Sequence, residues 1–249
     1  MCFFYPDGSF IEYPIHHYEI YETISQSGEL VGALCEDRDP DRYYDDARIH
    51  KLLLFDRDAN LLFEKTYNSI RPTQGRYSIA ISPNDEYVAV ALAELQEHRY
   101  PIYIYNTHTG ELLFEVNKKI GTQLFFSPDS DYLCISGGGA GVVIDCETGN
   151  LIWSRFIDTD SDPHVERVED LFCTNDAKII YWLAERISPR IYWPMLSVGT
   201  DAKIISESIF GRPSVSPNGC FYIAQRYLDV ASSSPQETPF SVSILRGVD

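Results

Sequence analysis

Acidic side chains gather in two stretches of this chain, where they would attract a positively charged partner. Residues 36–46, which begin with Glu36, contain six acids against two arginines, and residues 157–170 contain six acids against one arginine. Two adjacent tyrosines lie in the first stretch, and aromatic side chains commonly anchor protein interfaces. The predicted partner-binding residues are Asp37, Asp39, Asp41, Tyr43, Tyr44, Asp45, Asp46, Asp158, Asp160 and Asp162.

Metal binding and catalysis require tighter arrangements of side chains than these stretches show. Asp37, Asp39 and Asp41 alternate as in the opening of a calcium loop, but Arg42 takes the place of its essential glycine. The six histidines and six cysteines fall at no metal-ligand spacing, and no Gly-x-Ser-x-Gly nucleophile motif occurs. We therefore predict no metal, no cofactor and no catalytic residue, and hence a protein that is not an enzyme.

The net charge bears on which classes of partner are possible. The 249 residues include 37 Asp and Glu against 20 Lys and Arg, a formal net charge of −17. Such a surface repels nucleic-acid phosphates and anionic membranes, and it accelerates the encounter with a basic protein. We therefore expect a basic protein partner, no nucleic acid and no membrane.

The amino terminus predicts a cytoplasmic location. Residues 1–5 have neither a basic segment nor a long apolar segment of the kind that directs export. Four of the six cysteines fall in predicted strands, where a free thiol behaves as a small apolar group. A bacterial cytoplasm is the expectation, and the alternative is a trimmed lipoprotein that begins near Cys2.

A repeated unit must position the acidic stretches. Its turn residue occurs at Ser25, Ser82, Ser127, Cys173 and Ser216, with separations of 57, 45, 46 and 43 residues. Each copy reads as a strand, a Ser-Pro-Asn/Asp turn, a strand, a loop, a strand, a Thr-Gly turn and a strand. In the copy with the clearest punctuation the strands are residues 77–82, 87–93, 102–105 and 112–116. A period of roughly 40 to 50 residues with four strands per copy predicts a β-propeller.

Five copies account for nearly the whole chain, so we predict an all-β, single five-bladed propeller domain over residues 1–249. The last copy supplies three strands, at residues 213–216, 220–227 and 240–245. Residues 10–14 are expected to add the fourth strand and close the ring, because closure removes the unpaired edges of the first and last blades.

The punctuation of the repeats resembles that of the WD-repeat-like propeller family across essentially the whole chain. Ser127-Pro128-Asp129 and Thr148-Gly149 carry the resemblance, while the Gly-His and Trp-Asp pairs of that family are absent. The resemblance implies a propeller fold.

The long connections of the predicted blades share one face. In a propeller the turns between the first two and the last two strands of each blade lie on one face, and all other connections lie on the opposite face. The first kind is short throughout this chain, whereas the second kind includes six long connections. They are residues 36–47, 66–75, 94–101, 157–169, 185–190 and 228–239. Because loops on a rigid scaffold commonly carry binding residues, we expect function at this face.

These observations favour a non-catalytic propeller that captures a basic protein. In its most concrete form it is a bacterial immunity or inhibitor protein that neutralises a toxin. One alternative is a glycosidase or lyase whose paired carboxylates are assembled from different blades. Another is a general scaffold subunit of a larger complex, which predicts additional apolar patches on the rim of the blades.

Overall fold

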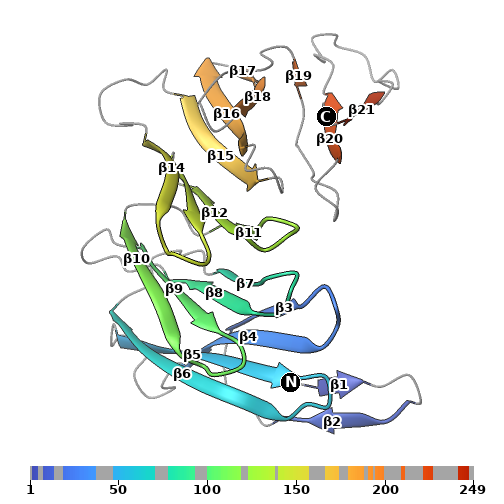
Figure 1. Cartoon of the computed structure of the whole chain (residues 1–249), viewed down its shortest axis with the longest axis vertical. Helices are drawn as coiled ribbons and strands as arrows, with labels where there is room; N and C mark the ends of the chain where they lie inside the picture. Colours follow the sequence, from blue (N-terminus) through green and yellow to red (C-terminus); the bar gives the residue numbers. More distant parts are fainter. Residues whose placement is uncertain are drawn as a thin grey trace. The chain divides into compact units, whose positions relative to one another are not determined.

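The computed structural model shows an all-β chain, in which every regular element of the described residues is a strand (Figure 1). The described residues are 2–4, 8–13, 19–37, 47–70, 78–92, 100–118, 123–137, 140–156, 166–173, 179–187, 190–192, 194–198, 209–210, 221–226 and 241–246. Side chains are described within 8–13, 21–36, 49–67, 78–92, 101–116, 123–137 and 140–154. The chain divides into two compact units, Met1–Leu124 and Phe125–Asp249. The single domain over residues 1–249 stays a prediction.

Two four-stranded antiparallel sheets form the body of the first unit. The first has the order β3 (Glu19–Ile24), β4 (Leu30–Asp37), β5 (Ala47–Asp56) and β6 (Leu61–Ile70). The second has the order β7 (Ser78–Ile81), β8 (Tyr87–Ala91), β9 (Tyr100–Asn106) and β10 (Leu112–Lys118). Sequence order and spatial order agree in both sheets, as predicted for propeller blades.

The second unit begins with a third sheet of the same order and continues with shorter pairings. The third sheet comprises β11 (Gln123–Phe126), β12 (Tyr132–Gly137), β13 (Ala140–Asp145) and β14 (Leu151–Phe156). A fourth sheet has the order β15-β16-β18-β19, with β17 paired to β16, and β20 pairs with β21. The bounds of these strands are β15 (Glu166–Cys173), β16 (Ile179–Ile187), β17 (Arg190–Tyr192), β18 (Pro194–Val198), β19 (Ile209–Phe210), β20 (Phe221–Arg226) and β21 (Ser241–Arg246).

The amino-terminal strands form a local hairpin, in place of the pairing expected for ring closure. β2 (Phe10–Glu12) pairs with β1 (Cys2–Phe4), whereas the described partner of β21 is β20. Pairing across a short loop has a smaller entropic cost than pairing the two ends of the chain. Five blades and closure by residues 10–14 are therefore not confirmed.

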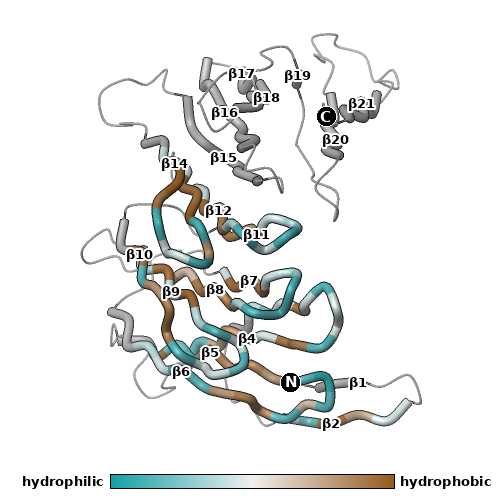
Figure 2. Tube along the Cα trace, viewed as in Figure 1, coloured by the Kyte–Doolittle hydropathy of each residue, from teal (hydrophilic) through white to brown (hydrophobic). Residues whose placement is uncertain are grey.

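The central strands β4 and β5 of the first sheet are buried on both faces, which explains their nearly continuous apolar runs. On one face Leu34 and Leu52 form a cluster with Val88 and Val90 of the second sheet. The sheets approach so closely at Gly32 that an added Cβ would lie 2.8 Å from Ile79 Cδ1. A side chain at this position would have to displace the end of the Ile79 side chain. Figure 2 shows the central strands as apolar and the turns as polar.

A buried serine organises the first turn of each of the three sheets. The Ser82 hydroxyl accepts a hydrogen bond from the Tyr87 N–H at 2.9 Å and donates one to Asn84 Oδ1 at 2.7 Å. The Ser127 hydroxyl makes the same bonds to the Tyr132 N–H and to Asp129 Oδ1. In the first sheet, Ser25 Oγ accepts from the Leu30 N–H and bonds with Ser27 Oγ. These bonds explain why serine recurs two residues before a polar residue in each described repeat.

An Asx residue and a glycine organise the second turn of two sheets. Asn106 Oδ1 accepts hydrogen bonds from the N–H groups of His108 and Thr109, and Gly110 follows with a φ of +65°. Asp145 makes the corresponding bond to the Thr148 N–H at 2.7 Å. The bonds from the Thr148 N–H and hydroxyl hold the pKa of Asp145 below its usual range.

Replacing Asp145 by asparagine is expected to remove one contribution to acid unfolding. The folded pKa of Asp145 lies below its unfolded value, so its contribution to stability is present above about pH 4 and is lost as the pH falls through the folded pKa. Asn106 shows that an asparagine oxygen accepts the same backbone bonds. The stability of the wild type relative to the Asp145→Asn variant, measured by urea unfolding, should therefore be greater near pH 7 than near pH 3. A difference that does not change with pH would contradict this assignment.

Candidate functional site

The predicted acidic stretches fall in the kind of connection that the sequence indicated. Residues 38–46 join β4 to β5, and residues 157–165 join β14 to β15. Of the predicted site, only the backbone of Asp37 is described, and it lies opposite Ile49 in the β4–β5 pair. Nine predicted residues lie outside the described residues: Asp39, Asp41, Tyr43, Tyr44, Asp45, Asp46, Asp158, Asp160 and Asp162. The ten-residue site stays a prediction.

Glu36 was predicted to be one of the acids of an exposed loop, and the structure places it elsewhere. It lies within β4, directly opposite His50 of β5, and each side chain is only 1% exposed. Glu36 Oε2 and His50 Nε2 are 3.9 Å apart. Glu36 is therefore a buried side chain at the base of the 38–46 connection and not part of a solvent-exposed acidic loop.

Tyrosines extend this buried polar group into the second sheet. Tyr67 of β6 lies opposite His50, so the three side chains of Glu36, His50 and Tyr67 share one face of the first sheet. The Tyr67 hydroxyl donates a hydrogen bond to the Tyr105 hydroxyl at 2.9 Å, and the Tyr67 ring stacks on Tyr103. Burial raises the pKa values of both Tyr67 and Tyr105, so these phenols stay neutral.

We call Glu36, His50, Tyr67, Tyr103 and Tyr105 the buried polar cluster. At 1% exposure, neither Glu36 nor His50 is placed to contact a substrate in this conformation. Glu36 and His50 pair the end of β4 with β5, and the Tyr67–Tyr105 hydrogen bond joins β6 to the second sheet. The sequence signal for it is a titratable residue two positions after apolar Leu34 and another two positions before apolar Leu52, which alternation along a strand places on the same face as those leucines.

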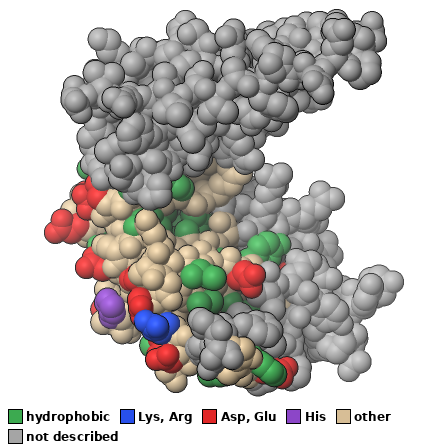
Figure 3. All heavy atoms as spheres, turned by 90° about the vertical axis from the view of Figure 1, so that its right-hand side faces the viewer, with side chains coloured by type: hydrophobic (Ala, Val, Ile, Leu, Met, Phe, Trp, Pro, Cys, Tyr) green, Lys and Arg blue, Asp and Glu red, His purple; other side chains and the backbone are tan. Residues whose placement is uncertain are grey.

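The short turns lie at the other end of the sheets and are also strongly acidic. They comprise residues 25–29, 56–60, 82–86, 106–111, 127–131 and 145–150. Their only lysine or arginine is Arg57, against ten acids. These acids are Glu29, Asp56, Asp58, Asp85, Glu86, Glu111, Asp129, Asp131, Asp145 and Glu147. Figure 3 looks onto this end and shows acidic side chains spread among apolar ones. The acidity of the chain is therefore not confined to its long connections.

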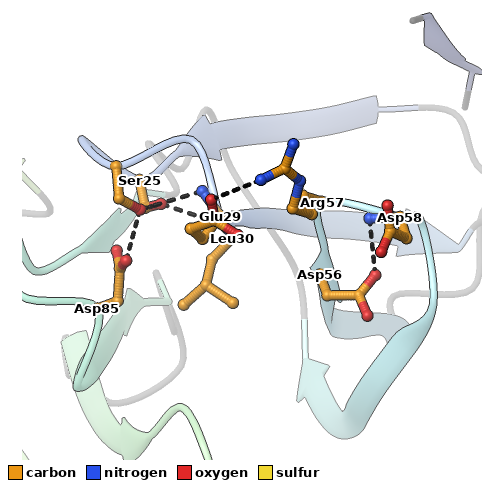
Figure 4. Close-up of polar contacts among 8 residues, drawn as sticks. Ser25, Glu29, Leu30, Asp56, Arg57, Asp58 and Asp85 are labelled. Carbon is orange, nitrogen blue, oxygen red and sulfur yellow. Dashed lines mark hydrogen bonds and ion pairs between the residues drawn. The ribbon is translucent and has the colours of Figure 1, made fainter.

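One hydrogen bond connects short turns of the first and second sheets, and another connects the two short turns of the first sheet. The Ser27 hydroxyl donates to Asp85 Oδ2 at 2.5 Å, and Arg57 Nη1 donates to Glu29 Oε1 at 3.0 Å (Figure 4). The ion pair of Arg57 with Glu29 is exposed and adds little to stability.

The acids in the turns of the third sheet repel one another, and this repulsion affects the pKa of Asp131. Partial burial raises the pKa of Asp131, and the neighbouring carboxylates of Asp129, Asp145 and Glu147 raise it further. A positively charged partner would relieve this repulsion.

Within the described part of the chain, no three His, Cys, Asp or Glu side chains come together in an arrangement that would hold a metal ion. None of these residues forms a helix with the length and hydropathy needed to cross a membrane. The predictions concerning metal, cofactor and membrane stay predictions.

Comparison with known proteins shows the fold. No protein-family model matches the chain, and no curated protein matches its sequence. The β-propeller domain of the Trilobed protease from Pyrococcus furiosus is similar in structure, with a TM-score of 0.60 and 16% sequence identity over 92% of this chain and 70% of that one. Acylaminoacyl peptidase from Pyrococcus horikoshii gives a TM-score of 0.57 at 14% identity, over 91% of this chain and 38% of the peptidase. Dipeptidyl peptidase 4 from Porphyromonas gingivalis gives 0.52 at 16% identity, over 90% of this chain and 35% of the peptidase.

These similarities overturn the prediction that the protein is not an enzyme. That prediction was based on the absence of catalytic motifs from the chain, but a propeller of similar structure is a domain of a protease. Motifs missing from a propeller sequence therefore do not exclude an enzyme, because propeller folds occur in peptidases. The fold alone shows no activity for this chain. What the strand order and the comparisons together establish is an all-β chain of the β-propeller type, built from four-stranded antiparallel sheets.

Proposed function

We propose that this chain is a β-propeller that binds a basic protein partner. The observation that carries the proposal is the excess of acids on its exposed turns, where ten acids stand against Arg57 alone. The acids predicted to bind in residues 37–46 and 158–162 add to the same negative field. Fields of this kind raise the rate of encounter with a cationic partner and make that rate depend on salt.

The more specific form of the proposal is an immunity or inhibitor protein that neutralises a basic toxin. Its support is the net charge of −17 on a small rigid scaffold, which favours fast electrostatic capture. A second form, a scaffold subunit, is favoured by exposed aliphatic residues at the outer strands, among them Leu61 and Leu62 of β6. Both forms are protein-binding functions and differ in the partner.

Two variants, each lacking four negative charges, show whether the partner binds at the long connections or at the short turns. One carries Asn at Asp39, Asp41, Asp45 and Asp46, and the other carries Asn at Asp58 and Gln at Glu86, Glu111 and Glu147. The probe is a lysine–serine peptide, with a glutamate–serine peptide as the charge-reversed control. We expect the loop variant to slow association more and to flatten its salt dependence, because the loop acids lie within one eight-residue stretch of a single connection. A greater loss in the turn variant would move the site to the short turns, and no binding of the lysine peptide to the wild type would refute the proposed function.

The tyrosines predicted at this site are tested by the dissociation rate of a bound partner. Interface aromatics mainly slow dissociation, so Tyr44→Ala should raise the dissociation rate of a bound basic partner about tenfold, if it costs ~1.4 kcal/mol. Unchanged association together with faster dissociation would place Tyr44 in the contact surface.

A further inference from the structure

The fourth strands of the first three sheets begin in the same irregular way. In the β5–β6 pair, Phe55 lies opposite Leu61 and Leu54 lies opposite Phe63, so Leu62 has no partner position and forms a β-bulge. The same shift leaves out Leu113 in the β9–β10 pair and Ile152 in the β13–β14 pair. Each bulge lies between an aliphatic residue and an aromatic residue. The three-residue segments are Leu61-Leu62-Phe63, Leu112-Leu113-Phe114 and Leu151-Ile152-Trp153.

The two aliphatic side chains of each segment are exposed to solvent. The exposed fractions are 38% and 46% for Leu61 and Leu62, 44% and 36% for Leu112 and Leu113, and 46% and 44% for Leu151 and Ile152. A single exposed leucine requires no explanation. Pairs recur at the same position of three sheets, each beside a bulge, and exposed apolar patches on a protein commonly mark interaction sites.

In the first unit the turn that precedes one of these pairs packs against the residue that follows the other pair. Phe63 turns inward, where its ring lies 6.2 Å from that of Tyr105, and a Cβ added at Gly110 would be 3.0 Å from Phe63 Cγ. The turn that leads into β10 therefore packs on the start of β6, and Figure 2 shows that start as apolar. We call Leu61, Leu62, Leu112 and Leu113 the rim patch.

The charges around the rim patch are mainly acidic. Asp58, Glu111 and Glu115 are exposed within a few residues of it along the chain. The nearest base on these strands is Lys65, whose Nζ lies 5.8 Å from the Phe63 ring centroid and 5.7 Å from that of Tyr105. An apolar surface with acidic neighbours is complementary to a segment that carries both aliphatic and basic side chains.

Two other occupants of the rim patch are disfavoured, namely an added β-strand and a second copy of this chain. β6 and β10 are outer strands of their sheets. A bulge followed by the charged residues Glu64 and Lys65 opposes the addition of a further strand, which leaves side chains to make the contact. A second copy of the chain would bring two surfaces of the same charge together, with a net charge of −17 on each copy.

We propose that the rim patch docks a partner segment in which leucine-like side chains alternate with lysine or arginine. The rim patch contains none of the residues of the acidic 38–46 connection, so the inference goes beyond the proposed function. Isothermal titration with a lysine–leucine peptide and with a lysine–serine peptide of equal length and charge tests it. The leucine peptide should bind the wild type about tenfold more tightly, as expected when a few aliphatic side chains are buried.

Two double variants decide whether the rim patch is responsible. Leu62→Ser with Leu113→Ser should abolish the advantage of the leucine peptide, whereas Phe10→Ser with Ile49→Ser should preserve it. The control residues are also exposed, at 59% and 40%, but lie outside the rim patch. Unchanged melting temperatures would show that both variants fold.

Three other results would overturn the inference. These are equal affinity for the two peptides, an advantage that survives in the rim variant, and self-association of the wild type that disappears in it. The last result would assign the patch to a second copy of the chain. The two proposals can fail separately. If the lysine–leucine peptide binds at the rim patch and the lysine–serine peptide does not bind at all, the rim-patch inference stands and the proposed electrostatic binding of a basic partner is refuted.

Discussion

Replacing Phe55 by alanine is expected to lower the free energy of unfolding by about 3 to 5 kcal/mol, the range for removing a buried aromatic side chain. Phe55 is fully buried at the end of β5, in a cluster with Ala33, Cys35 and Leu53. The Tyr13 ring meets it edge to face, with 4.8 Å between the ring centroids. The variant would lose these contacts and leave a cavity between the first sheet and the amino-terminal segment. Urea unfolding followed by tyrosine and tryptophan fluorescence measures the change.

Phe10 provides the matched control for this prediction. It is also a phenylalanine in a strand of the first unit, but 59% of it is exposed, so Phe10→Ala should change stability by less than about 0.5 kcal/mol. Tyr13→Ala combined with Phe55→Ala should cost less than the sum of the single changes, because the two rings share a contact. A Phe55→Ala variant as stable as the wild type would show that the cluster around this ring is not part of the core.

Breaking the Glu36–His50 pair is expected to destabilise the protein by about 3 to 5 kcal/mol for each single replacement by leucine. Each single change leaves the other polar side chain buried at 1% exposure without this neighbour. Replacing both by leucine fills the site with apolar groups, and such double replacements are often close to neutral. The double variant should therefore be more stable than either single variant.

A double-mutant cycle on urea unfolding measures this coupling. The control is a cycle between Glu36 and Arg57, an exposed residue in the turn after β5, where the changes should be additive to within about 0.5 kcal/mol. Additive effects for Glu36 and His50 would mean that the two side chains act independently of each other. A peptide-binding assay on the double variant then shows whether the buried polar cluster serves the 38–46 connection, because a purely structural role would leave binding unchanged.

The turns made the strand pattern of this protein predictable from its sequence. The predicted strands 77–82, 87–93, 102–105 and 112–116 correspond to β7, β8, β9 and β10 to within a few residues. The reason is that Ser82 and Asn106 bond to the backbone of their own turns. Short-range chemistry of this kind can be recognised without knowing the fold.

Features that depend on contacts between distant residues were not predictable in this way. The burial of Glu36 depends on its position opposite His50, which is set by the register of β4 and β5. The bulge at Leu62 likewise depends on how the preceding turn aligns β5 with β6. The pairing of residues 10–14 with the last repeat was predicted from the repeat count and is not confirmed, because β2 pairs with the neighbouring β1. The candidate site was inferred from charge, from the pair of tyrosines and from the length of the connections, and its side chains lie outside the described residues.

The serine-centred turns also bear on how this chain acquires its structure. Ser25, Ser82 and Ser127 each complete their bonds within five residues of their own position. Contacts between neighbours in the sequence form quickly, and hairpins typically form within about 1 to 10 microseconds. Each sheet therefore brings its own nucleus, and a chain that emerges gradually from the ribosome is able to order one sheet before the next is synthesised. Duplication or loss of a whole repeat would keep these nuclei intact, and this gives the architecture a simple route to a different number of blades.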